Sequence, residues 1–402
     1  MTTAGEPVPG LDLPQRTLLG PGPSNVHPRV LRALSLPCVG HLDPAFLEVM
    51  NGTAALLRRV FETRNRLAMA VSGTGSAGME AALVNFIEPG DTVIVGVNGL
   101  FGERMADIVE RAGGRPVRVE APWGEPLDPD DVARAVAANP GVRAVAAVHA
   151  ETSTGVLQPL EPLARLCREH EALFIVDAVT SLGGTEVKVD EWGLDVVYSG
   201  AQKCLSCPPG LAPLTAGDRA VEVLLGRKTK VRSWYLDLPM VISYWGAERF
   251  YHHTAPVNMI YALYEALRLV LEEGLEARFA RHRLNGRALL AGVAAMGLEP
   301  FAREGYRIPM LLSVKVPEGV DDLTVRRELL ARANVEIGGG LGPTRGRIWR
   351  IGLLGHSSRR ENVLLVLAAL EAALNRQGRR VEPGAALAAA EAVYAAAAGA
   401  AG

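Results

Sequence analysis

The sequence has few of the features that mark secreted, membrane-spanning or nucleic-acid-binding proteins. Its 402 residues include four cysteines, too few and too irregularly spaced for a disulfide framework. No long uncharged apolar run occurs, and the N-terminal residues lack the basic and then apolar pattern of a signal peptide. A net charge of -2 argues against a nucleic-acid or anionic-membrane surface. We therefore expect a cytoplasmic protein that acts on small molecules.

Lysine is also scarce, and this draws attention to Lys203. Of the five lysines, only Lys203 follows both an apolar run, 196–198, and a turn of small residues. A second apolar run, 174–176, ends at Asp177, and open α/β sheets place their chemistry at such strand ends. A desolvated lysine can form an imine with a carbonyl, and an aspartate can keep a ring nitrogen protonated. Pyridoxal phosphate requires both groups. A surface lysine and a helix-capping aspartate would give the same pattern.

Three motifs around these residues resemble those of the alanine-glyoxylate and serine-glyoxylate aminotransferases. They are 151–159, 176–184 and 198–210, and the similarity extends from Leu19 to Gly355. These relatives are class V, fold-type I pyridoxal phosphate enzymes. The resemblance implies an α/β fold like that of aspartate aminotransferase, with a large three-layer domain around a mostly parallel sheet and a smaller α+β C-terminal domain. It also implies ping-pong transamination of alanine or serine with glyoxylate or a similar 2-oxo acid.

The resemblance assigns roles to individual residues. Lys203 would form the imine with pyridoxal phosphate, Asp177 would hold the pyridine nitrogen, and Arg350 would bind the substrate α-carboxylate. A buried guanidinium requires an anion in any case, and its planar fork fits a carboxylate. The other implied cofactor contacts are Thr74, Gly75, Ser76, Phe101, Thr152, Gln202, Tyr251 and Thr254. The last two would reach the site of the partner subunit in a homodimer.

A glycine-rich loop offers a different interpretation. Gly73-x-Gly75-x-x-Gly78 follows an apolar run and precedes a helical pattern, as in dinucleotide-binding proteins, so a dehydrogenase is a rival hypothesis. Such proteins carry an acid at the end of the next strand to hold the ribose. Here Asp91 precedes that strand, 92–95, and the acid is missing. The same loop can equally hold a phosphate at a helix N-terminus.

Further alternatives remain open at the level of sequence. Related aminotransferases for aminoethylphosphonate, phosphoserine or pyridoxamine share the overall pattern, whereas a cysteine desulfurase would need a cysteine beyond Cys207. His149 and Glu151 could form an acid/base pair, but no nearby ligand has metal-site spacing, so we predict no metal. Cys204 and Cys207 precede two prolines and are expected to pack beneath the cofactor rather than react.

The variation in amino-acid composition along the chain predicts four segments. Residues 1–25 are rich in glycine and proline and form an arm, and 26–275 form the large cofactor-binding domain. Residues 276–378 form the small domain. The alanine-rich tail, 379–402, is expected to be a loose helix or disordered.

Overall fold

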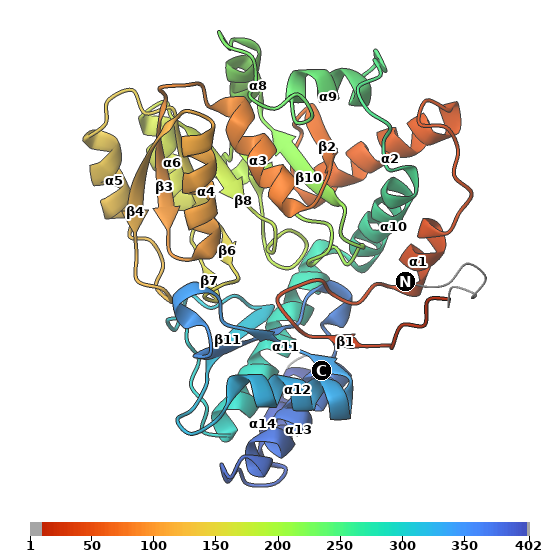
Figure 1. Ribbon diagram of the computed structural model, residues 1–402, viewed down its shortest axis with the longest axis vertical. Helices are drawn as coiled ribbons and strands as arrows, with labels where there is room; N and C mark the ends of the chain where they lie inside the picture. The colour runs from red at the N-terminus through yellow and green to blue at the C-terminus, as the bar shows by residue number, and fades with distance from the viewer. Residues whose placement is uncertain (1–9, 400–402) are drawn as a thin grey trace, which may run out of the picture.

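The computed structural model describes residues 10–399, which form a larger and a smaller unit (Figure 1). The larger unit is built around a seven-stranded sheet of order β2-β10-β9-β8-β5-β3-β4. Within this sheet β10 runs antiparallel to both of its neighbours, and the other pairs are parallel. The strands are β2 (Leu67–Ser72), β3 (Thr92–Val97), β4 (Arg115–Glu120), β5 (Ala144–Val148), β8 (Leu173–Asp177), β9 (Val196–Tyr198) and β10 (Leu211–Ala216).

Helices cover both faces of this sheet, because successive side chains of a strand point to opposite sides. In β5, Val145 and Ala147 belong to one buried cluster, whereas Ala144 and Ala146 belong to the other. Every residue of β5 and β8 is buried, as expected for parallel strands covered on two faces. The helices of this unit are α1 (Pro28–Leu34), α2 (Pro44–Val60), α3 (Gly75–Phe86), α4 (Leu100–Arg111), α5 (Pro129–Ala137), α6 (Glu161–Glu169), α7 (Val189–Trp192), α8 (Asp218–Leu225), α9 (Leu238–Trp245) and α10 (Val257–Glu273).

The smaller unit, drawn from cyan to blue in the lower part of Figure 1, contains a three-stranded antiparallel sheet of order β11-β14-β13. Trp349 and Ile351 of the central strand are fully buried in its core. The strands are β11 (Leu311–Lys315), β13 (Gly338–Gly339) and β14 (Ile348–Gly352), and the helices are α11 (Leu275–Ala295), α12 (Asp322–Ala333) and α13 (Arg360–Arg376).

Both ends of the described chain pack against this smaller unit. Near the N-terminus, β1 (Thr17–Leu18) pairs in parallel with β12 (Val335–Glu336). The alanine-rich segment, expected to be loose or disordered, forms α14 (Ala385–Gly399). Its Ala386 and Ala390 are fully buried, and a Cβ at Gly292 of α11 would lie 2.9 Å from the Ala386 carbonyl oxygen. Small residues on both helices therefore permit a close approach that composition alone does not reveal.

The architecture confirms the predicted fold class, an α/β unit with a mostly parallel sheet and a smaller α+β unit. Two further short elements, β6 (Ala150–Glu151) and β7 (Val156–Leu157), form a hairpin beyond the end of β5. Within residues 10–399, the structure has no helix with the length and apolar character needed to cross a membrane.

Candidate active site

A cavity of about 190 Å³ lies where the parallel strands β5, β8 and β9 end. Strand ends meet at one edge of a parallel sheet, so residues far apart in sequence converge there. The cavity is lined by eight of the predicted site residues: Thr74, Gly75, Ser76, Phe101, Thr152, Asp177, Gln202 and Lys203. The structure thus brings together most of the set that was assigned from the resemblance.

Lys203 follows β9 in a turn and is held against the N-terminal arm. Its Nζ donates a hydrogen bond to the carbonyl oxygen of Pro21. A Cβ at Gly22 would lie 2.6 Å from Lys203 Cδ, so the arm and the lysine side chain are in direct contact. Burial, with a smaller contribution from Arg350, lowers the pKa of Lys203 to about 8. A neutral amine is therefore accessible near neutral pH.

Asp177 is the last residue of β8, and the protein holds both of its carboxylate oxygens. Oδ2 accepts a hydrogen bond from the Tyr198 hydroxyl at 3.0 Å, and Oδ1 accepts one from the Val179 backbone N–H at 2.8 Å. Burial raises its pKa from the ordinary value of 3.8 to about 7. A cationic ring nitrogen at this point would offset the burial and keep the carboxylate ionised.

The N-terminus of helix α3 contributes to the wall of the cavity. Its N-cap is Thr74, and no side chain caps the helix, so its first backbone N–H groups face the cavity beside Gly75 and Ser76. The dinucleotide interpretation finds no support here. Asp91 pairs with Arg143 at 3.0 Å at the amino end of β3, the end of the strand remote from this loop.

The residues of the cavity fit pyridoxal phosphate. The group requires an amine, a carboxylate and a phosphate site in one enclosure, and Lys203, Asp177 and the N-terminus of α3 provide them. The buried Oε1 of Gln202 has no hydrogen-bond partner among the described residues, although it belongs to a residue that lines the cavity. An enclosed acceptor without a donor indicates a site built for a polar ligand.

Arg350 approaches this region from β14 of the smaller unit. Its Nε donates to the Gly339 carbonyl at 2.8 Å and its NH1 to the Thr152 carbonyl at 3.2 Å, while the residue is only 6% exposed. Burial lowers its pKa to about 10. Within the described chain no carboxylate lies within ion-pair distance of Arg350, and Arg345 and Arg347 are exposed. Arg350 is thus a buried cation that lacks an anion.

Tyr251 and Thr254 lie elsewhere. Their hydroxyl oxygens are 3.3 Å apart, and Tyr251 is 52% exposed. Neither residue lines the cavity of its own chain. The predicted contact of these two residues with a phosphate in the partner subunit stays a prediction.

Two charged residues near the cavity were not recognised as cofactor-site residues from sequence. The guanidinium of Arg104 lies 5.1 Å from the centre of the Phe101 ring, and both residues line the cavity. Phe101 and Arg104 are one helical turn apart on α4, and this spacing was the sequence feature that could have predicted their contact. Glu151 is fully buried, and its carboxylate accepts hydrogen bonds from the backbone N–H groups of Phe101 and Ser153, each at 3.0 Å. It anchors the start of α4 rather than acting with His149.

His149 and the two cysteines after Lys203 are buried and uncharged. Burial lowers the pKa of His149 to about 4, and its ring packs edge-on against Trp192. Burial raises the pKa of Cys204 to about 11 and that of Cys207 still further, so both remain thiols. These properties agree with packing roles for the cysteines.

A buried lysine and aspartate at the carboxyl edge of a mostly parallel sheet, together with a free helix N-terminus, define a fold-type I pyridoxal phosphate enzyme. Residues 26–343 match the family described as "Aminotransferase class-V". The chain belongs to this family and is a pyridoxal phosphate-dependent aminotransferase, which confirms the predicted enzyme class and cofactor.

Several of the relatives that the chain resembles are named as glyoxylate aminotransferases. The chain is 46% identical to a (S)-ureidoglycine--glyoxylate transaminase of Bacillus subtilis, with 95% of this chain and 96% of the relative covered. It is 42% identical to an alanine--glyoxylate aminotransferase of Callithrix jacchus, over 90% of this chain and 89% of the relative. The crystal structure of ureidoglycine-glyoxylate aminotransferase from Bacillus subtilis superposes with a TM-score of 0.94 at 48% identity, covering 96% and 99% of the two chains.

Proposed function

We propose that this protein transfers the amino group of a small amino acid, alanine or serine, to glyoxylate or another small 2-oxo acid. The observation that carries the proposal is Arg350, a buried guanidinium beside the Lys203 cavity whose partners within residues 10–399 are backbone carbonyls. An α-carboxylate would provide the missing anion through paired, charge-assisted hydrogen bonds. Both donor and acceptor carry such a group.

The residues divide the chemistry between them. Pyridoxal phosphate, when bound, supplies an electron sink that stabilises negative charge at the substrate Cα. The Lys203 amine is the base that removes the proton from Cα, and its lowered pKa leaves part of it neutral near pH 7. Asp177, held by Tyr198 and Val179, keeps a proton on the ring nitrogen. Phe101 would stack on the ring, steadied by the Arg104 guanidinium.

A single site for the substrate carboxylate explains the order in which the two substrates bind and react. Because Arg350 would bind both the amino donor and the 2-oxo acid, the two substrates occupy the site in turn. The donor leaves as its 2-oxo acid before glyoxylate enters and receives the amino group. Ping-pong kinetics follow.

The assembled enzyme is proposed to be a cytoplasmic homodimer. Tyr251 and Thr254 are half-exposed or exposed outside the cavity of their own chain, as expected if they complete the phosphate site of the partner. Free thiols at all four cysteines suit a reducing compartment. In this proposal the arm ends at residue 25, the large domain at residue 275 and the small domain at residue 378.

Ureidoglycine is the second candidate donor. The Bacillus subtilis relative that carries this substrate in its name is 46% identical and is covered almost completely. Alanine and ureidoglycine share the α-amino acid group that Arg350 and Lys203 would bind. They differ only in what lies beyond Cα, so the same site would process either.

Absorbance of the purified enzyme loaded with pyridoxal phosphate tests the proposal. Alanine, serine or ureidoglycine is added without an acceptor, and the visible band of the lysine-bound cofactor is followed. We expect the productive donor to abolish the band and glyoxylate to restore it. The Lys203→Ala variant should lack the band altogether, whereas Lys188→Ala, which removes an exposed lysine, should retain it. A band that no donor alters, or that survives in Lys203→Ala, would refute the proposal.

A further inference from the structure

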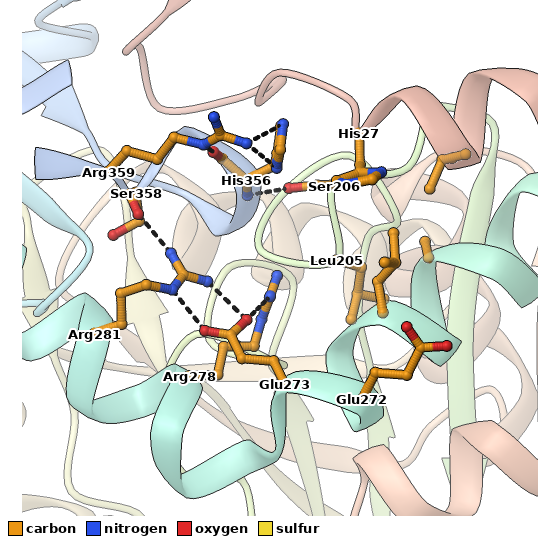
Figure 2. Close-up of a pocket in the computed structure, with 13 residues that line it drawn as sticks. His27, Leu205, Ser206, Glu272, Glu273, Arg278, Arg281, His356, Ser358 and Arg359 are labelled. Atoms are coloured by element: carbon orange, nitrogen blue, oxygen red, sulfur yellow. Dashed lines mark hydrogen bonds and ion pairs between the residues drawn. The ribbon is translucent and has the colours of Figure 1, made fainter. Parts of the chain in front are cut away.

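A second cavity, of about 440 Å³, lies against the turn that follows Lys203 and is separate from the cofactor site (Figure 2). Four segments form it. His27 is the N-cap of α1 and Val30 lies within that helix, whereas Leu205 and Ser206 come from the lysine turn. The remaining walls are α10 with the start of α11 and residues 356–359. Residues of both the larger and the smaller unit therefore form the walls of the cavity. Its volume is within the usual range of small-molecule sites.

The lining carries more positive than negative charge. Arg278 and Arg281 both bind the carboxylate of Glu273, each at 2.6 Å, as Figure 2 shows. One carboxylate thus serves two guanidinium groups. The third lining cation, Arg359, has Glu361 as its one carboxylate neighbour among the described residues, at 3.6 Å, and that glutamate is largely exposed. The remaining lining acid, Glu272, is already paired with arginines of α1 and α10.

Two histidines face each other across the unit boundary beside Arg359. The rings of His27 and His356 are 4.9 Å apart in an edge-to-face arrangement. His27 Nδ1 accepts a hydrogen bond from the Arg29 backbone N–H at 3.0 Å, so its Nε2 carries the ring hydrogen. No described residue accepts that hydrogen. Arg359 NH2 lies 2.7 Å from His356 Nε2, so the guanidinium adjoins the second ring of the pair.

The surroundings keep both imidazoles neutral. Burial, followed by neighbouring arginines, lowers the pKa of His27 and lowers that of His356 to about 4. An anion beside them would reverse part of this effect and raise both pKa values, so its binding would be coupled to proton uptake. The charged groups around the pair from all four elements are Arg29, Arg32, Glu265, Glu272, Glu273, Arg278, Arg281 and Arg359.

We propose that this cavity binds a small doubly charged oxyanion, a dicarboxylate or a phosphate ester, between His27, His356 and Arg359. The ring N–H of His27 and the incompletely paired guanidinium supply the donors, and Val30, Leu205 and Leu269 supply an apolar floor for a short carbon chain. The site does not depend on which amino donor the enzyme uses.

A chain of hydrogen bonds connects this site to the catalytic lysine. The His356 backbone N–H donates to Ser206 Oγ at 2.8 Å, and Ser206 Oγ bonds Ser24 Oγ at 2.9 Å. Ser24 Oγ in turn donates to the carbonyl oxygen of Lys203 at 2.9 Å. A bound anion would therefore restrain the lysine turn and the arm together, and aminotransferase turnover should change when the site fills.

Sulfate is a suitable first probe, because it remains doubly charged throughout the pH range in which histidine titrates. The holoenzyme is titrated calorimetrically with sulfate at constant ionic strength, at about pH 6 and about pH 8. We expect saturable binding that is tighter at the lower pH. Arg359→Gln should weaken it about tenfold or more, the cost of losing one charge-assisted contact. His27→Asn, which can still accept the Arg29 hydrogen bond, should reduce the pH dependence.

Matched controls separate this site from non-specific charge effects and from the active site. Arg360→Gln removes the adjacent positive charge, which pairs with Glu391 outside the cavity, and should bind sulfate normally. Arg350→Gln removes any sulfate binding at the substrate site, so the binding that Arg359→Gln weakens should persist in it. Equal losses in Arg359→Gln and Arg360→Gln, or loss of all saturable binding in Arg350→Gln, would overturn the proposal.

Two organic probes then identify the class of ligand. Malonate represents the dicarboxylates and glycerol phosphate the phosphate esters. At least one of them should bind more tightly than sulfate and change the rate of transamination. If both bind more weakly than sulfate, the site holds an adventitious ion only and the proposal fails.

Discussion

At the scale of single residues, Arg350 is a buried positive charge that favours the binding of an anionic ligand. The cost of burying a guanidinium is partly recovered by the carbonyls of Gly339 and Thr152, but the cation itself is not neutralised by the described chain. This unbalanced charge provides binding energy for an anionic substrate. It is also the reason why burial lowers the Arg350 pKa.

The variant Arg350→Gln should bind both substrates poorly. A hydrogen-bonded charge pair contributes about 1.5–3 kcal/mol, so we expect KM for the amino donor and for glyoxylate to rise roughly 10- to 100-fold. Steady-state kinetics with each substrate varied would measure the change. Arg347→Gln, which removes an exposed arginine near the same strand, is the control. Similar effects in the two variants would contradict the assignment.

Asp177 should make the cofactor-free protein sensitive to pH. Burial raises its pKa from 3.8 to about 7, so its stabilising protonated form is complete below the lower value and is lost as pH rises through the higher one. Asp177→Asn cannot ionise. Relative to the wild type, the variant should therefore gain stability between about pH 5 and about pH 8. The gain should be up to about 3 kcal/mol, because about two pKa units of the shift lie above pH 5 and each contributes about 1.4 kcal/mol.

Urea unfolding of both cofactor-free proteins at the two pH values would measure this difference. Bound pyridoxal phosphate should reduce it, because the cationic ring nitrogen stabilises the carboxylate. A difference in unfolding free energy that does not change with pH would show that Asp177 is ionised without the cofactor.

At the scale of elements, the N-terminus of α4 depends on an acid from the β5–β6 region. Glu151 accepts the Phe101 N–H, and Ser153 Oγ accepts the Leu100 N–H at 3.0 Å. A carboxylate is well suited to this place, because it caps free N–H groups at the positive end of the helix dipole. The ring of Phe101 is thereby held at the cavity.

Glu151→Gln should loosen this helix start. An amide provides one acceptor where the carboxylate has two, so we expect the free energy of unfolding to fall by about 1–3 kcal/mol and cofactor affinity to fall with it. Thermal unfolding and titration with pyridoxal phosphate would measure the two effects. Glu120→Gln, at an exposed site on β4, should change neither. Reduced stability with normal cofactor affinity would contradict a positioning role.

At the scale of the whole molecule, a group of aromatic side chains on the larger unit is exposed. Trp234, Phe250 and Tyr251 are 64%, 65% and 52% exposed. Trp234 stacks on His252, and Tyr251 packs beside His41, so the group is not scattered. Exposed apolar groups of this kind mark interaction surfaces, and the proposed homodimer would cover them.

Phe250→Glu should prevent dimer formation, because it would bury a carboxylate without a partner. Sedimentation velocity should show monomers, and the variant should lose pyridoxal phosphate on gel filtration because Tyr251 and Thr254 of the partner are absent. Leu323→Glu changes an exposed leucine of α12 and should remain dimeric. A dimeric Phe250→Glu variant would place the interface elsewhere.

Much of the fold and of the cofactor site was predictable from local patterns. Apolar runs ending at Asp177 and before Lys203 indicated parallel strands, and Gly75 with Ser76 indicated a phosphate site at a helix start. Each signal lies within one strand–turn or loop–helix segment, and the order of strand ends in a parallel sheet then brings the segments together. The identity of the family followed from several such segments in sequence order.

The sequence by itself thus determined the fold class and the cofactor, and it predicted the residues that would hold the cofactor. Only the tertiary structure showed that β10 inserts antiparallel between β2 and β9, that α14 packs on α11, and that His27 meets His356. It also placed Arg350 against Thr152. These contacts join segments from different parts of the chain, and their formation depends on complementary packing and charge balance. The periodicity of apolar residues within one segment does not predict packing or charge balance between distant segments.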